Sequence, residues 1–233
     1  MKTGGRYSRA PITEAVIDLQ VELPEGTAVS DLARCHAGQE EAYPYRQERR
    51  LAGDQTNPAG FVFTSADHRQ VFQALLGGFS MSRLPPYESW QQLRDEARRL
   101  WNLYRRVAKP ARVTRVAVRY INRFDLPLPV KDLKDYFRTA PEVSPDLPQA
   151  LAGFFMQLTI PHLDIKSVLL LSETIVGSTE PGSVGVILDF DLYRIEDIPE
   201  EEDHLWQLFD DLRVRRNAIF EACITDQARE LIR

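Results

Sequence analysis

Three arginines are spaced so that they project from one side of a single strand. The residues from Val113 to Phe124 alternate between apolar and polar side chains, and Arg115, Arg119 and Arg123 all fall on the polar side. Consecutive arginines in this row are four residues apart, which is about 13 Å along an extended chain. One phosphate cannot bridge that distance. The row therefore fits either separate carboxylate partners on neighbouring strands or an elongated anionic ligand.

Acidic side chains occupy the polar side of two other predicted strands. Glu14 and Asp18 alternate with apolar residues near the N-terminus, and Asp189 and Asp191 do so in the second half of the chain. Strand pairing could place these carboxylates opposite the arginines as cross-strand ion pairs, whose net contribution to stability is small. The sequence leaves two interpretations open. The charged residues form structural ion pairs, or they form a face that binds an anionic small molecule or a protein partner.

One pattern has the residue types of a metal-dependent nucleotide enzyme. Gly177 and Ser178 precede Asp189 and Asp191, an arrangement that resembles the Gly-Ser and Asp-x-Asp signature of polymerase-beta-like nucleotidyltransferases. Two carboxylates two residues apart on a strand share a face and can hold Mg²⁺ against a triphosphate, which a Gly-Ser turn can cradle. The sequence departs from that family because a proline and a glycine follow Ser178, where the family has a helix. A hairpin loop is the preferred interpretation, and the nucleotide-handling enzyme is the alternative.

Other reactive residue types lack the required spacing. Cys35 and His36 are neighbours on a predicted short helix, where adjacent side chains point about 100° apart. The four histidines show no ligand spacing, and two distant cysteines support neither a disulfide framework nor a zinc site. There is no glycine-rich phosphate loop and no catalytic motif of a hydrolase or metalloprotease. The sequence thus predicts no metal, no cofactor and no catalytic residue, and it favours a protein that is not an enzyme.

The composition is that of an ordinary globular protein. The 233 residues are 43% hydrophobic and 27% charged, and the net charge is −5. This charge argues against a nonspecific nucleic-acid binder, which normally has a basic surface. The N-terminus lacks the apolar core of a secretory signal, and no apolar run is long enough to span a bilayer. We therefore predict a cytoplasmic protein without a membrane partner, and the sequence does not indicate its oligomeric state.

Hydrophobic periodicity predicts an α+β fold in which strands outnumber helices. A long amphipathic helix follows Pro85 and Pro86 and ends at Pro110, and a second one begins at the acidic stretch 200–203. Short helices are predicted over 30–36 with Ser30 as N-cap, over 133–137, and after Thr225 or Asp226. The predicted strands are residues 12–23, 45–51, 61–66, 70–76, 113–124, 154–160, 167–176 and 184–193.

The predicted elements run twice in the same order. A strand, a short helix, three or four strands and a long helix occupy residues 12–107 and again 113–224, which could reflect an internal duplication or coincidence. A Val-x-Asp-Leu segment recurs at 29–32 and 130–133, and a Trp-Gln pair recurs at 90–91 and 206–207. We predict a single compact domain over 1–233 with halves of about 12–110 and 111–233. In it, two long helices cover one side of antiparallel sheet.

The second long helix carries two basic residues that interrupt its apolar side. Arg215 and Arg216 could lie at the edge of that side, could pair with an acid such as Asp211 or Glu221, or could belong to a solvated charged face. The same surface could also contact a partner. These alternatives remain open at the level of the sequence.

Five blocks of sequence, taken in order, resemble a known family. They are residues 10–18, 79–90 (FSMSRLPPYESW), 118–123, 187–191 and 217–226. Their order and spacing are similar to those of a family of uncharacterised prokaryotic proteins with a sporadic distribution. The resemblance covers almost the whole chain, but it implies no activity and no catalytic residue. It implies a set of marker positions: Glu14, Asp18, Arg83, Tyr87, Arg119, Asn122, Arg123, Asp189 and Asp191.

Overall fold

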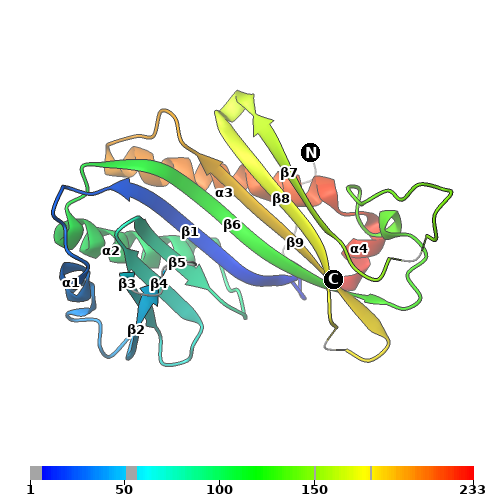
Figure 1. The fold of residues 1–233 in the computed structure, drawn as a ribbon, viewed down its shortest axis with the longest axis horizontal. Helices are drawn as coiled ribbons and strands as arrows, with labels where there is room; N and C mark the ends of the chain where they lie inside the picture. The colour runs from blue at the N-terminus through cyan, green and yellow to red at the C-terminus, as the bar shows by residue number, and fades with distance from the viewer. Residues whose placement is uncertain (1–6, 51–56, 150, 179) are drawn as a thin grey trace.

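A computed structural model describes residues 7–50, 57–149, 151–178 and 180–233 (Figure 1). These residues form a mixed α+β structure, which confirms the predicted fold class. The strands of the first half are β1 (Ile12–Glu22), β2 (Tyr45–Arg50), β3 (Pro58–Thr64), β4 (Gln70–Leu75) and β5 (Gly78–Arg83). Those of the second half are β6 (Arg112–Pro127), β7 (Phe155–His162), β8 (Ser167–Val176) and β9 (Ser183–Arg194).

All nine strands of the described chain join one antiparallel sheet. Their order across it is β2-β3-β4-β5-β1-β6-β9-β8-β7. The long strands β1 and β6 are neighbours in the middle, where Figure 1 shows them crossing the molecule together. The two halves of the chain therefore meet along a continuous backbone ladder.

The helices agree closely with the periodicity of the sequence. The first half contains α1 (Val29–Leu32), the 3₁₀ turn η1 (Ala33–His36) and α2 (Trp90–Ala108). The second half contains the 3₁₀ turns η2 (Leu133–Asp135) and η3 (Leu163–Ile165), and the helices α3 (Glu202–Cys223) and α4 (Asp226–Leu231). As predicted, the Thr225 side chain caps α4 by accepting a hydrogen bond from the Ala228 N–H. The predicted N-cap Ser30 is wrong, because α1 begins at Val29 and Ala28 is its N-cap.

Strand β5 is absent from the predicted elements. It follows β4 after a tight turn and pairs with both β4 and β1. Gly78 opens it with a φ of 151°, and a Cβ there would lie 2.1 Å from the Leu19 carbonyl oxygen, so only glycine fits. The sequence does contain a signal for this strand. Phe79 and Met81, which are both buried, alternate with serines.

The two long helices pack their apolar sides on different parts of the sheet. Helix α2 contacts β5 and β1, and the rings of Trp101 and Tyr104 lie 5.9 and 6.0 Å from the ring of Phe79. Helix α3 contacts β6 and β9, and the Phe220 ring lies 6.4 Å from that of Phe124. Among the described residues, no helix combines the length and hydropathy required to cross a bilayer.

Candidate functional site

The register of the three central strands brings the predicted charged residues together. Between β6 and β9, Arg119 pairs with Asp191 and Ile121 pairs with Asp189. Between β1 and β6, Asp18 pairs with Ala117. Side chains of directly paired residues project on the same side of a sheet. The carboxylates and guanidiniums that the sequence places on separate strands therefore share one face.

Arg115 connects two carboxylates from different strands. Its Nη1 donates to Asp18 Oδ1 and its Nη2 donates to Asp191 Oδ2, each at 2.6 Å. The guanidinium carbon also lies 4.6 Å from the ring centroid of Tyr193, within the range of a cation–π contact. Only 16% of the Arg115 side chain is exposed. Burial raises the pKa of both Asp18 and Asp191, while the charge of Arg115 acts in the opposite direction.

Arg119 is the most exposed arginine of the row. Its Nε and Nη2 donate to both carboxylate oxygens of Asp189, at 2.5 to 3.1 Å. The Arg119 side chain is 45% exposed, whereas that of Asp189 is 14% exposed. Hydrogen bonding to Asp189 raises the pKa of Arg119, and the charges of Asp191 and Glu14 contribute in the same direction. Glu14 therefore belongs to the same group of charges, although it forms no ion pair with Arg119 closer than 4 Å among the described contacts.

Arg123 has a different partner from the ones that the sequence suggested. It donates to Asp125, two residues further along β6, and to the carbonyl oxygen of Gly177. Ser178 also donates to Asp125. Hydrogen bonding to Arg123 is the largest factor that lowers the pKa of Asp125. Asp125 continues the odd-numbered polar positions of β6, so alternation could have identified it. We call these charged residues the ion-paired face: Glu14, Asp18, Arg115, Arg119, Arg123, Asp125, Asp189 and Asp191.

The residues of the nucleotidyltransferase-like pattern lie apart. Ser178 is hydrogen-bonded to Asp125 and lies 2.6 Å from the hydroxyl of Ser183, in the loop between β8 and β9. Asp125 is paired with Gly185, which is four residues from Asp189, or about 13 Å along the strand. Asp189 and Asp191 are both hydrogen-bonded to guanidiniums. Among the described residues, no group of three or more His, Cys, Asp or Glu side chains could hold a metal ion.

The other sequence candidates have structural environments. Cys35 is buried, and burial raises the pKa of its thiol to about 12, so the thiol is protonated near neutral pH. The Nε2 atom of His36 lies 2.7 Å from the Tyr43 carbonyl oxygen. Among the marker positions, Arg83 pairs with Glu88 at 3.3 Å, and Tyr87 and Tyr120 share a hydrogen bond of 2.7 Å. These marker positions therefore do not all belong to the ion-paired face.

Arg216 has an environment that none of the sequence alternatives anticipated. It is buried on the side of α3 that faces the sheet, and its guanidinium carbon lies 3.4 Å from the centroid of the Tyr120 ring. No carboxylate within the described chain lies within salt-bridge distance of it, and its Nε has no hydrogen-bond partner there. Arg215 instead pairs with Asp164. One of the open alternatives, pairing of these arginines with Asp211 or Glu221, is therefore not observed among the described residues, because Arg215 pairs with Asp164 and α3 turns Arg216 inward against the sheet.

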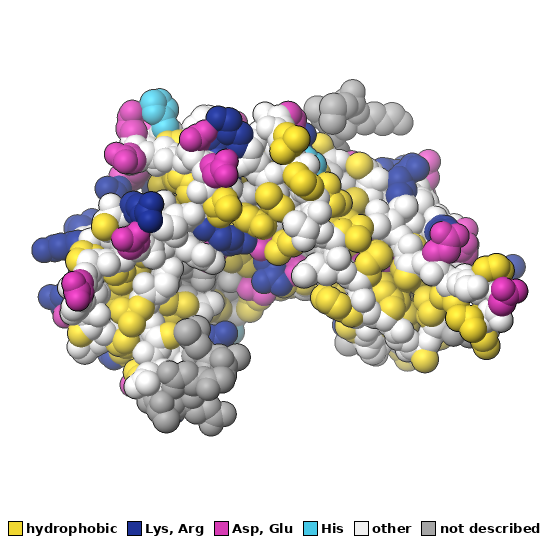
Figure 2. Space-filling view, turned by 45° about the horizontal axis from the view of Figure 1, so that its top comes forward, with side chains coloured by type: hydrophobic (Ala, Val, Ile, Leu, Met, Phe, Trp, Pro, Cys, Tyr) yellow, Lys and Arg dark blue, Asp and Glu magenta, His cyan; other side chains and the backbone are white. Residues whose placement is uncertain are grey.

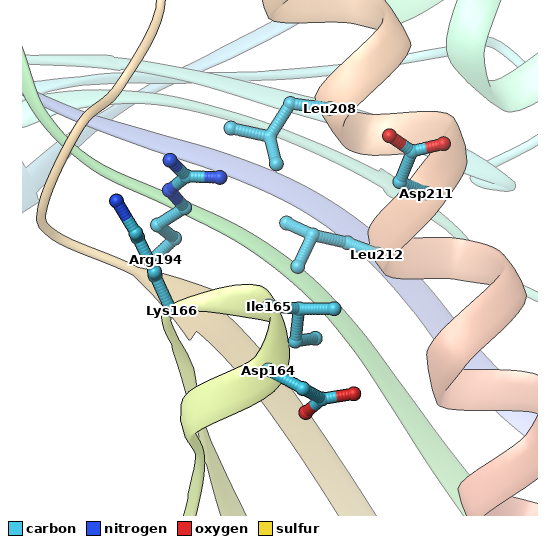
Figure 3. A pocket seen from close by; sticks show the side chains of 7 residues that line it. All are labelled: Asp164, Ile165, Lys166, Arg194, Leu208, Asp211 and Leu212. Carbon is cyan, nitrogen blue, oxygen red and sulfur yellow. The ribbon is translucent and has the colours of Figure 1, made fainter.

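A small pocket of about 240 Å³ lies between η3 and α3 (Figure 3). Leu208 and Leu212 of α3 face it, with Arg194 and Lys166 on one side in the view of Figure 3. Arg194 already donates to the backbone carbonyls of Glu196 and Asp197, and Lys166 pairs with Asp197 at 2.5 Å. Both cations beside the pocket therefore already bind groups in the turn after β9. This pocket is a weaker candidate than the ion-paired face.

No protein-family model matches the chain, and no curated protein matches it either.

Proposed function

We propose that this chain is a binding protein that docks a protein partner on the ion-paired face. The observation that carries the proposal is the concentration of eight charged side chains from β1, β6 and β9 on one face of the sheet. Figure 2 shows the surface hollowed between two lobes, with basic and acidic side chains gathered in the hollow. We infer that this hollow contains the ion-paired face, since the central strands run between the lobes.

The balance of charge favours a protein partner over a small anion. The ion-paired face contains three arginines and five carboxylates, and each arginine is already hydrogen-bonded to an aspartate. A small anion would have to displace an aspartate from a guanidinium in a region with excess negative charge. A protein surface with side chains of both signs could instead add to the existing pairs. Arg119 is the natural contact, because arginines at the centre of interfaces often dominate the binding energy.

The layering of the fold supports the same proposal. We infer that α2 and α3 cover one side of the sheet and leave the ion-paired face on the other side. Phe79 pairs with Leu19, and Leu19 pairs with Val116, so these side chains share the side on which α2 packs. Every second residue of β6 after Val116 lies on that same side, and Phe124 is one of them. Phe124 packs there against α3. A sheet with one side filled by helices has its other side available to a partner.

We also infer an internal duplication. In the sheet, the first strand of each half is flanked by the last strand of that half, followed by the earlier ones in reverse: β1-β5-β4-β3-β2 and β6-β9-β8-β7, so the first half has one additional outer strand, β2. The two series extend in opposite directions from the β1–β6 contact, and each half ends in a long helix. A twofold arrangement of this kind would place the ion-paired face next to the axis, where residues from both halves meet.

The alternative of a magnesium-dependent nucleotide enzyme has no observation in its favour. It would require Asp189 and Asp191 to exchange their guanidinium partners for Mg²⁺. It would also require the Gly-Ser turn to contact the same nucleotide, although that turn lies about 13 Å away along the strand. Isothermal titration of the protein with ATP and Mg²⁺ tests it directly. Heat of binding that disappears in an Asp189→Asn variant would favour the enzyme over the binding protein.

Replacing Arg119 with alanine should remove partner binding while leaving the fold intact. We expect the loss of an exposed cation to lower the free energy of unfolding by about 1 kcal/mol, because the remaining Asp189 is only partly solvated. Removal of a central arginine should weaken the complex by about 2 kcal/mol, or roughly thirtyfold. The measurement is native mass spectrometry of protein purified from its own host, with and without the substitution.

Arg98→Ala is the matched control for this experiment. Arg98 donates to Glu202 at 3.0 Å and to Asp203 at 2.6 Å, and its side chain is 37% exposed, but it lies on α2. The proposal predicts a bound protein in the parent and in the Arg98 variant, and its loss from the Arg119 variant. A small anion found in its place would indicate the other ligand class. Equal retention of the bound species by both variants would contradict a role for the ion-paired face.

A further inference from the structure

The two edges of the sheet have opposite chemistry. The outer strand β2 has the sequence YRQERR, in which four of six residues are charged. The outer strand β7 has the sequence FMQLTIPH, which contains no Lys, Arg, Asp or Glu. Charged side chains on an outer strand prevent other chains from pairing with it. Strand β2 therefore has this protection, whereas β7 has no Lys, Arg, Asp or Glu, and within the described residues it pairs with β8 alone, which leaves the backbone groups of its outer side without a strand partner.

The uncharged character extends well beyond β7. No Lys, Arg, Asp or Glu occurs from Leu147 to Leu163, a run of 17 residues in a chain that is 27% charged. Phe155 is 70% exposed and Leu163 is 85% exposed. The segment contributes five of the nine large hydrophobic side chains that are exposed in the described chain, namely Leu147, Leu151, Phe155, Ile160 and Leu163. Exposed apolar groups concentrated in one segment are typical of an interaction site.

We propose that β7 pairs with β7 of a second copy of this chain, in antiparallel orientation about a twofold axis. An antiparallel pair of identical strands is self-complementary, because each residue that contacts a given position is contacted in return. The pairing would satisfy the outer N–H and C=O groups of the strand. Pro161 has no N–H to donate, so the pairing is centred on residues 155–160. Two nine-stranded sheets would then become one continuous sheet.

The chemistry of the segment favours a second copy over a different partner. A charged peptide strand would find no opposite charge between Leu147 and Leu163, whereas an identical segment meets no repulsion. Pairing of β7 with β2 of another copy would build open filaments, but the charges of β2 disfavour it. Stable dimers bury about 1,200 Å² or more, so the exposed leucines beside β7 must also take part in the contact.

Replacing Thr159 with lysine should dissociate the dimer. Thr159 is an exposed residue of β7, so a lysine there can point into solvent in the monomer, whereas the dimer would bring two lysines close together. The mass of the full-length protein should be measured by light scattering and sedimentation over a concentration series. We expect the parent to have twice the 26.7 kDa of one chain and the variant to associate about tenfold more weakly or worse.

Gln47→Lys is the matched control, because Gln47 is an exposed residue in the middle of the other outer strand. This variant should form dimers as the parent does. A monomeric parent, or equal association of all three proteins, would overturn the proposal. Backbone hydrogen exchange of the parent gives a second measurement that needs no substitution. The amides of β7 should become protected as the protein concentration rises, and protection independent of concentration would also overturn it. Binding to lipid vesicles by a monomeric parent would assign the apolar segment to a membrane surface instead.

Discussion

Replacing Arg115 with methionine should lower the free energy of unfolding by about 3 kcal/mol at pH 7. Arg115 is the only cation within salt-bridge distance of both Asp18 and Asp191 in the described part of the chain. Without it, two partly buried carboxylates remain close together, and Arg119, which forms no salt bridge with either in the described chain, offsets their charge only in part. The Oδ1 atom of Asp191 already has no hydrogen-bond partner among the described residues. Methionine retains most of the side-chain volume, so the measured loss reflects charge more than packing.

The effect of this substitution should depend on pH in a defined direction. Burial raises the pKa of Asp18 and Asp191 in the parent, and removal of the cation should raise both pKa values further. The folded variant would then bind more protons than the unfolded chain at pH values above the ordinary aspartate pKa. Its stability should therefore increase as the pH falls from 7 towards 5, and the difference from the parent should shrink. Urea denaturation at both pH values measures this difference.

Arg112→Met provides the control for the same strand. Arg112 pairs with Glu22 of β1 at 2.7 Å, but the two side chains are 70% and 56% exposed. An exposed pair of this kind contributes about 0.5 kcal/mol or less. If both variants lose the same small amount, then Arg115 is as dispensable as an ordinary surface cation. The central ion pairs would then contribute little to the fold, and binding would be the remaining reason for their arrangement.

The charged face could be predicted because strand alternation determines it locally. The period of two places Arg115, Arg119 and Arg123 on one side of β6 wherever the strand lies in the sheet. The pairing of specific acids could not be predicted, because it depends on which strands are neighbours and on their register. Arg123 is an exception, because its partner Asp125 lies two residues further along the same strand, where alternation alone could have identified it. Binding at this face remains a prediction.

The buried charges could not be predicted from the sequence, because they depend on how α3 lies on the sheet. Helical spacing places Arg216 beside apolar residues, but the sequence does not show that Tyr120 and Tyr87 lie beneath it. Glu173 shares its side of β8 with Leu171 and Ile175, so alternation points it towards the core but does not show whether water still reaches its carboxyl group. The structure places it at 1% exposure. Tertiary packing decides whether such a residue is solvated.

Replacing Glu173 with methionine should stabilise the protein, and the gain should grow with pH. Neither carboxyl oxygen of Glu173 has a hydrogen-bond partner among the described residues, and burial raises its pKa from 4.5 to about 8. Between these two pH values the folded protein binds one proton more than the unfolded chain. Stability contributed by this group is therefore complete below pH 4.5 and falls by about 1.4 kcal/mol per pH unit up to pH 8. The variant lacks this loss, so it should exceed the parent by about 4 kcal/mol at pH 8.

The pH dependence separates this effect from a simple improvement in packing. Better packing by methionine would raise the stability of the variant equally at all pH values, whereas removal of the carboxyl group gives a difference that rises from pH 5 to pH 8. Urea denaturation of both proteins across this range measures the slope. Glu25→Gln removes an exposed carboxylate and should leave the slope of the parent unchanged. A difference between the Glu173 variant and the parent that stays constant with pH would mean that Glu173 ionises without cost. Its carboxylate would then have to be stabilised by polar groups or water that reach it beneath α3.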